Sequence, residues 1–142
     1  MSHTTRADTD GTGHAWELRA EATTLGLWRK EVAMAVAKLG GNCEAVEVAR
    51  LGVSELLSNV AAHVADPACR LEVLRDQGGI RVQLFDHSPV APAVLTPRWE
   101  AERGRGLWLL RELADGLGYV LTPSGKWVWF VINSAEPDRE AS

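Results

Sequence analysis

The chain has 142 residues, of which 46% are hydrophobic and 24% are charged, and its formal net charge is −4. This length suits one globular domain with a real core, and the charge gives no electrostatic reason to expect nucleic acid or an anionic membrane as partner. Cys43 and Cys69 lie far apart without a Cys-x-x-Cys pair, which argues against a zinc site and predicts reduced thiols in a cytoplasmic protein. No apolar run approaches the roughly 20 residues that span a bilayer.

Polar segments frame the expected domain. Residues 1–13 are rich in Thr, Asp and Gly, and residues 134–142 are polar, so we expect a disordered tail and a polar tail around a domain at residues 14–133. Inside it, the alternation at residues 16–18 predicts a short edge strand. Helical spacing of apolar residues then predicts a helix at residues 23–39, which a Gly-Gly-Asn sequence ends.

The clearest predicted element is a helix at residues 43–65, followed by an Asp-Pro pair that stops it. Its apolar stripe follows an i, i+4, i+7, i+11 pattern through Val53, Leu57, Val60 and Val64. Two strands are expected next, at residues 71–74 and 80–85, with a hairpin turn at residues 77–79 between them.

The remaining pattern is a loop, a helix and a hairpin. Residues 87–103 hold three prolines and no sustained periodicity, and a loop of that length inside a domain is often a functional lid. A helix is expected at residues 106–117, followed by a hairpin of residues 119–121 with 126–132.

These elements predict an α/β fold, a two-layer sandwich. One twisted, mostly antiparallel sheet of four or five strands would have helices on one face. Trp127 and Trp129 share one face of the last strand, opposite Val128 and Phe130. Two interpretations stay open for this tryptophan row: it belongs to the core, or it anchors a partner on the uncovered face.

Three polar residues of the long helix share one face, because Glu55, Asn59 and His63 are spaced by four. A solvated helix face is one interpretation. In the other, Asn59 offers its amide oxygen to Mg²⁺, a cation that prefers oxygen ligands, and Glu55 acts one turn earlier as a general base. His63 either packs or hydrogen-bonds structurally, or it contacts a phosphate.

Two further sites carry chemistry. Asp86 has the parity of the apolar residues of its strand, so its carboxylate points toward the helices and needs a partner. It forms a turn in Asp-His-Ser-Pro, or it accepts a hydrogen bond from an exocyclic amine such as adenine N6. Residues 104–106, Gly-Arg-Gly, open directly onto a helix, either as a plain helix start or as an anion cradle of glycines, free N–H groups and a guanidinium.

The order of these motifs is more specific than any one of them. Over residues 16–132 the chain resembles the Bergerat-type ATPase domain shared by gyrase, histidine kinases and anti-sigma-factor serine kinases. Residues 55–63 match the N box of that superfamily, Asp86-His-Ser matches the aspartate of its first glycine box, and residues 104–107 match its second. The resemblance implies a Bergerat ATP-binding fold with ATP and Mg²⁺ as cofactors.

The same resemblance implies roles for individual residues. Glu55 would be the general base, Asn59 the Mg²⁺ ligand and Asp86 the adenine reader. The nucleotide-binding set implied in this way is Asn59, His63, Asp86, Ser88, Gly104, Arg105, Gly106, Leu107 and Lys126. One departure is Ser88, which stands where the first glycine box often has glycine and which reaches positive φ less freely.

Within the superfamily the chain is most similar to the small anti-sigma-factor type. We expect the domain to stand alone, the lid is short, and Gly125-Lys126 before the last strand is the usual ending there. The resemblance implies a sigma factor and an anti-anti-sigma antagonist as partners, and it allows a homodimer. Four hypotheses follow: a serine/threonine kinase, a module that sequesters a sigma factor, an interaction domain without nucleotide, and an orphan histidine-kinase catalytic domain.

Overall fold

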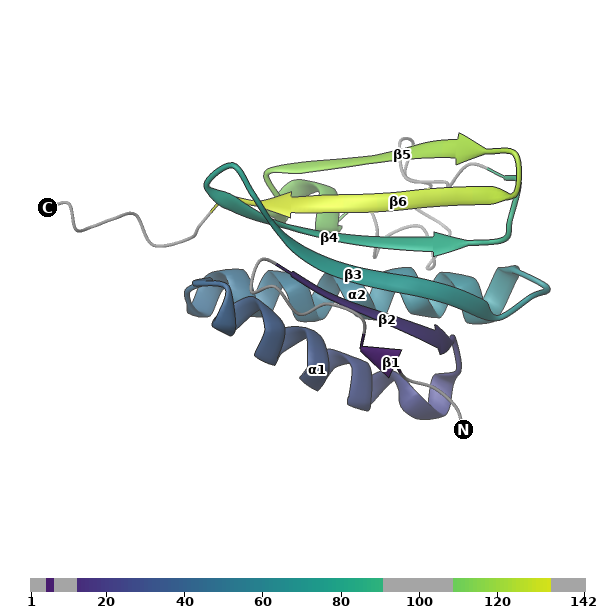
Figure 1. Cartoon of the computed structure of the whole chain (residues 1–142), viewed down its shortest axis with the longest axis horizontal. Helices are drawn as coiled ribbons and strands as arrows, with labels where there is room; N and C mark the ends of the chain where they lie inside the picture. The colour runs from purple at the N-terminus through teal and green to yellow at the C-terminus, as the bar shows by residue number, and fades with distance from the viewer. Residues whose placement is uncertain (1–4, 7–12, 91–108, 134–142) are drawn as a thin grey trace, which may run out of the picture.

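The computed structural model describes residues 5–6, 13–90 and 109–133, and in them one six-stranded sheet lies over helices (Figure 1). The strand order is β1-β2-β3-β4-β6-β5, and every neighbouring pair is antiparallel. The strands are β1 Thr5–Arg6, β2 Gly13–Arg19, β3 Ala68–Asp76, β4 Gly79–Asp86, β5 Gly116–Thr122 and β6 Gly125–Ile132.

Three helices have both ends in the described segments: η1 Ala22–Thr24, α1 Leu25–Lys38 and α2 Cys43–His63. Residues 109–113 are also helical. Both α-helices lie on the same face of the sheet and pack against each other (Figure 1). The predicted α/β sandwich, with helices on one face of an antiparallel sheet, is confirmed. Asn42 caps α2 by accepting a hydrogen bond from the backbone N–H of Ala45 at 2.8 Å.

The core lies between the two layers. Alternate residues of β4 and β6 face the helices and are buried, as period-two alternation requires. Gly52 of α2 faces the ring of Phe130, and a Cβ at residue 52 would overlap that ring. The missing side chain therefore lets α2 lie directly on β6.

The β3–β4 hairpin turns through Gln77 and Gly78, whose φ angles are 49° and 88°. Positive φ at both central residues is the geometry of a type I′ turn, which matches the right-handed twist of the flanking strands. The turn was predicted, but the strands are longer than the apolar runs indicated, because their polar residues continue the pairing on the exposed face.

Other predicted boundaries were also wrong. Thr5–Arg6, assigned to the disordered tail, pairs with Glu17 and Trp16 as a short strand, so β2 is flanked on both sides. The helix α2 ends at His63, two residues early. The last predicted helix is helical at residues 109–113 but does not reach residue 117.

After residue 113 the chain forms β5, and Gly118 lets this strand lie close against β6. Gly118 faces the Trp129 ring so closely that a Cβ would clash with it. The N–H of Asp115 donates to the carbonyl oxygen of Val131 at 2.8 Å, which starts the pairing. Leu117 thereby lies opposite Phe130 in the sheet and not on a helix.

The second face of the sheet carries the tryptophan row. Trp127 and Trp129 are partly exposed there, while Val128 and Phe130 enter the core. The Phe85 ring contacts Trp127 at a centroid distance of 5.3 Å, and the Arg81 guanidinium lies 4.4 Å from the Trp129 ring centroid. The two tryptophans are therefore not core residues of the described structure. In the described segments, no helix has the length and apolar character to cross a membrane.

Candidate functional site

The candidate residues gather at one end of the sheet. Asp86 is the last residue of β4 and pairs with Cys69 near the start of β3 and with Lys126 near the start of β6. Because α2 runs into β3 through a four-residue connection, its C-terminal half lies under this same end (Figure 1). The half-helix carrying Glu55 and Asn59 and the Asp86 carboxylate are thus brought to one region.

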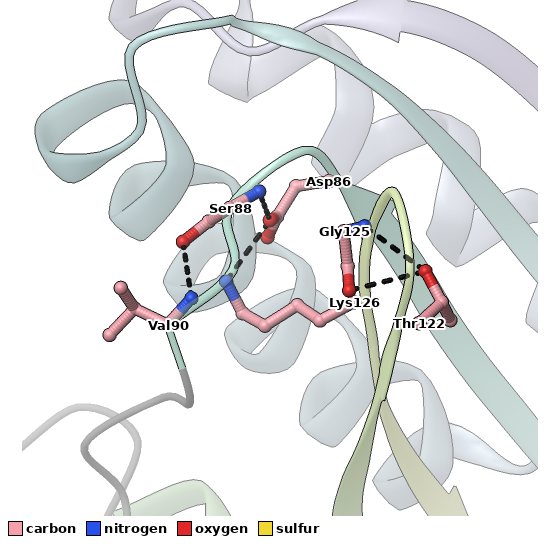
Figure 2. A network of polar contacts seen from close by, with 6 residues as sticks. All are labelled: Asp86, Ser88, Val90, Thr122, Gly125 and Lys126. Atoms are coloured by element: carbon pink, nitrogen blue, oxygen red, sulfur yellow. Dashed lines mark hydrogen bonds and ion pairs between the residues drawn. The ribbon is translucent and has the colours of Figure 1, made fainter.

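Asp86 and Lys126 form a buried ion pair. The side chains are 4% and 8% exposed, and Lys126 Nζ lies 3.0 Å from Asp86 Oδ1 (Figure 2). Lys126 is thus the partner that a buried carboxylate needs to offset the cost of removing its charge from water. The sequence predicted both residues as nucleotide contacts, but it did not predict that they contact each other. They are 40 positions apart in the chain, and only the β4–β6 register brings them together.

Asp86 also shapes the turn that follows it. Its Oδ1 accepts a hydrogen bond from the backbone N–H of Ser88 at 2.8 Å, and Ser88 Oγ accepts one from the N–H of Val90 at 3.1 Å (Figure 2). Asp86 therefore forms the turn that the first of its two interpretations predicted. Gln77 is the one described non-glycine residue with positive φ, so Ser88 does not need the conformation that glycine would favour.

Gly125 permits the close approach of the β5–β6 turn to this site. A Cβ there would overlap the Asp86 carbonyl oxygen and lie 2.8 Å from the Phe85 ring. Thr122 holds the turn, because its Oγ1 accepts from the N–H of Gly125 at 3.0 Å (Figure 2). The turn thereby fixes Lys126, the next residue, opposite Asp86.

The polar row of α2 borders the core instead of lying wholly in solvent. Glu55 and Asn59 are partly buried, and His63 is exposed at the end of the helix. Burial raises the pKa of the Glu55 carboxyl above its usual value, because desolvation disfavours the charged form. A carboxyl whose pKa is moved toward neutrality is better suited to act as a general base than a fully solvated one.

The described residues fit a weakly coordinated Mg²⁺ better than a metal cage. Within these segments, no three His, Cys, Asp or Glu side chains are grouped as metal ligands. Mg²⁺ commonly takes one or two protein ligands and fills its other positions with substrate phosphates and water. A single amide oxygen from Asn59 is compatible with that coordination preference.

Cys69, beside Asp86, is a packing residue. Burial, and after it the nearby Asp86 charge, raise the pKa of its thiol to about 12. The thiolate, which is the nucleophilic form, is therefore not available near neutral pH.

Four of the predicted nucleotide contacts, Gly104, Arg105, Gly106 and Leu107, lie outside the described residues. Residues 91–103 of the predicted lid also lie outside them.

Comparison with known proteins places the chain in a family. The profile of the histidine kinase-like ATPase domain matches residues 18–132. Among solved structures, the histidine kinase domain of the blue-light activated histidine kinase from Erythrobacter litoralis EL346 has a TM-score of 0.49 and 18% identity to this chain. The match covers 78% of this chain and 61% of that one, so the chain spans about three fifths of its length. No curated protein matches significantly.

Because the matched region covers most of its length, the chain belongs to the histidine kinase-like ATPase domain family. Membership supports an ATP-binding regulatory function, since domains of this family bind ATP, usually with Mg²⁺. The buried acceptor at Asp86 and the amide of Asn59 are the kinds of group that such a ligand requires.

Proposed function

We propose that the protein is an ATP- and Mg²⁺-binding regulator of the anti-sigma-factor type that phosphorylates a serine on an anti-anti-sigma antagonist. The proposal depends on one observation: the C-terminal half of α2, which carries the partly buried Glu55 and Asn59, lies under the end of the sheet where the Asp86 carboxylate is buried. Family membership supports nucleotide binding, and the resemblance to the small anti-sigma-factor branch supports the finer role.

In the proposed reaction, Asn59 would supply an oxygen ligand to Mg²⁺, and Asp86 would accept a hydrogen bond from the adenine N6 amine. Glu55 accepts the proton of the antagonist's serine hydroxyl while that oxygen attacks the γ-phosphorus. The bond to the β–γ bridging oxygen breaks, which yields phosphoserine and ADP. The second proposed partner, a sigma factor, would be held by a surface away from this reacting centre.

The test distinguishes a residue that binds Mg-ATP from a residue that takes part in phosphoryl transfer. Glu55→Ala should preserve Mg-ATP affinity and lower the transfer rate by about 10²–10⁴-fold, because a general base acts on a proton that moves during the reaction. Asn59→Ala should weaken Mg-ATP binding and also reduce transfer, because its ligand contact exists in the ground state. Calorimetric titration of Mg-ATP and labelled transfer to candidate antagonists measure the two effects.

Glu47→Ala is the matched control, since Glu47 is an exposed glutamate on the same helix. It should bind ATP and transfer phosphate as the wild type does. Full transfer by Glu55→Ala would mean that Glu55 is not the general base. Loss of both binding and transfer in Glu47→Ala would mean that the assay reports helix stability instead of chemistry.

A second candidate is a binding module that sequesters a sigma factor and uses ATP without turnover. The partly exposed aromatic row of Phe85, Trp127 and Trp129 on the second sheet face favours it, because aromatic residues are common anchors of protein interfaces. A wild-type protein that binds Mg-ATP and a sigma factor but transfers nothing to any antagonist would support this candidate over the kinase.

A further inference from the structure

Stability alone gives no reason for a buried lysine at position 126. Taking an ammonium and a carboxylate out of water carries a large desolvation penalty, and well-packed apolar residues of similar volume often hold two strands together equally well. Lys126 is nevertheless 6% exposed and directly opposite Asp86 in the β4–β6 register. The residue faces the covered side of the sheet, at the end where Asp86 and α2 meet.

The pair has hydrogen-bonding capacity beyond its own contact. A lysine ammonium has three donors, and a carboxylate has about four acceptor positions on its two oxygens. Among the described residues, Lys126 Nζ and the Ser88 N–H contact the carboxylate, and both contacts end on Oδ1 (Figure 2). A donor and an acceptor therefore stand side by side, held by the turns at Ser88 and Gly125.

We propose that Lys126 and Asp86 recognise the adenine base together, with Lys126 donating to ring N1 while Oδ2 of Asp86 accepts from the N6 amine. This inference depends on the proposed nucleotide site. On the adenine edge the N6 donor and the N1 acceptor are neighbours, so an acceptor beside a donor is the complementary arrangement. Guanine has an acceptor at O6 and a donor at N1, which would leave the same pair mismatched at both positions. Lys126 is thereby a specificity-determining residue.

The wild-type protein tests the proposal without any substitution. Calorimetry compares ATP with 1-deaza-ATP, in which N1 is replaced by a C–H group, and with purine riboside triphosphate, which lacks the N6 amine. Loss of a hydrogen bond to a charged group should weaken each analogue by about 10-fold or more. Equal affinity for ATP and 1-deaza-ATP would overturn the role of Lys126. Absence of ATP binding would instead contradict the proposed function.

Lys126→Met then assigns the effect to the side chain. The variant should bind ATP and 1-deaza-ATP equally well, because the donor to N1 is gone, while still discriminating against purine riboside triphosphate. A variant that keeps the full 1-deaza penalty would show that another group contacts N1. If Lys126 only positioned Asp86, the variant would lose the N6 penalty and retain that for N1, which also overturns the proposal.

Lys38→Met is the matched control. Lys38 is exposed in the last turn of α1. It is three residues before Gly41, where a Cβ would lie 3.1 Å from Ile80 at the opposite end of β4 from Asp86. This variant should keep both analogue penalties at wild-type size. Should Lys126→Met not fold, the analogue series on the wild-type protein still decides whether N1 is read.

Discussion

At the scale of single residues, Asp86 shows how far parity in a strand can predict chemistry. Its place in the β4 alternation predicted a carboxylate directed toward the helices and in need of a partner. The local Asp-His-Ser-Pro sequence predicted the turn that the Ser88 N–H makes with it. Lys126 could not be identified as its ion-pair partner, because no local pattern specifies which strands become neighbours.

Glu55 gives a prediction about pH. Its pKa is raised in the folded protein by desolvation, so the folded state favours the neutral acid. This contribution to stability is fully present below the unfolded value of about 4.5 and is lost as pH rises through the folded pKa. Glu55→Gln, which stays neutral, should therefore gain stability relative to the wild type as pH rises from 4 toward neutrality, measured by urea unfolding across that range.

The matched control for the Glu55 prediction is Glu47→Gln, which removes the same charge from an exposed position of α2. Subtracting its effect leaves the part that comes from burial at position 55. A stability difference for Glu55→Gln that shrinks as pH rises would have the wrong sign for a desolvated carboxyl, and the burial explanation would then be rejected.

At the scale of elements, the sequence predicted the helix and the turn that depend on residues close together in the chain. The helix α2 has a capping asparagine, a periodic apolar stripe and an Asp-Pro stop, and it was placed to within two residues. The Gln77-Gly78 turn was found because positive φ needs particular residues. The β5 strand was missed in part, since its start depends on the contact of Gly118 with Trp129 in the folded sheet.

The packing of α2 on β6 predicts opposite effects for two glycine substitutions. Gly52→Ala should destabilise the fold by about 1–3 kcal/mol, because the new methyl group overlaps the fully buried Phe130 ring and the helix must shift. Gly26→Ala is the helical control. Among the described residues, a Cβ there meets only Arg29, at 3.7 Å, so this substitution should stabilise the fold by about 0.5–1 kcal/mol through helix propensity. Urea unfolding of both variants measures the difference.

The same substitution also tests how α2 positions the site. A shift of α2 away from β6 would move Glu55 and Asn59 relative to Asp86, so Gly52→Ala should weaken Mg-ATP binding while Gly26→Ala should not. Equal stability and equal ligand affinity for the two variants would mean that the Phe130 ring moves aside at little cost in stability. The close contact at Gly52 would then not position the helix.

At the scale of the whole molecule, the two faces of the sheet lie in different environments. One face buries the apolar residues of β2, β3, β4 and β6 under α1 and α2, and the candidate site lies at one end of this layer. The other face carries paired charges at Arg70, Glu17 and Glu72 and the partly exposed tryptophans. Sequence alternation predicted that two such faces exist, but not that both tryptophans lie on the uncovered one.

A site between layers also predicts how ligand binding affects the fold. Mg-ATP that binds the folded protein alone should add about 2.7 kcal/mol to the free energy of unfolding at 100 times its Kd. Unfolding is followed with and without Mg-ATP, and with GTP at the same concentration, which should stabilise less if Asp86 and Lys126 recognise adenine. Asn59→Ala should gain less from Mg-ATP than the wild type, and the exposed control Lys38→Met should gain as much. If millimolar Mg-ATP leaves the wild-type unfolding curve unchanged, the nucleotide site is wrong, and the aromatic face becomes the better candidate for function.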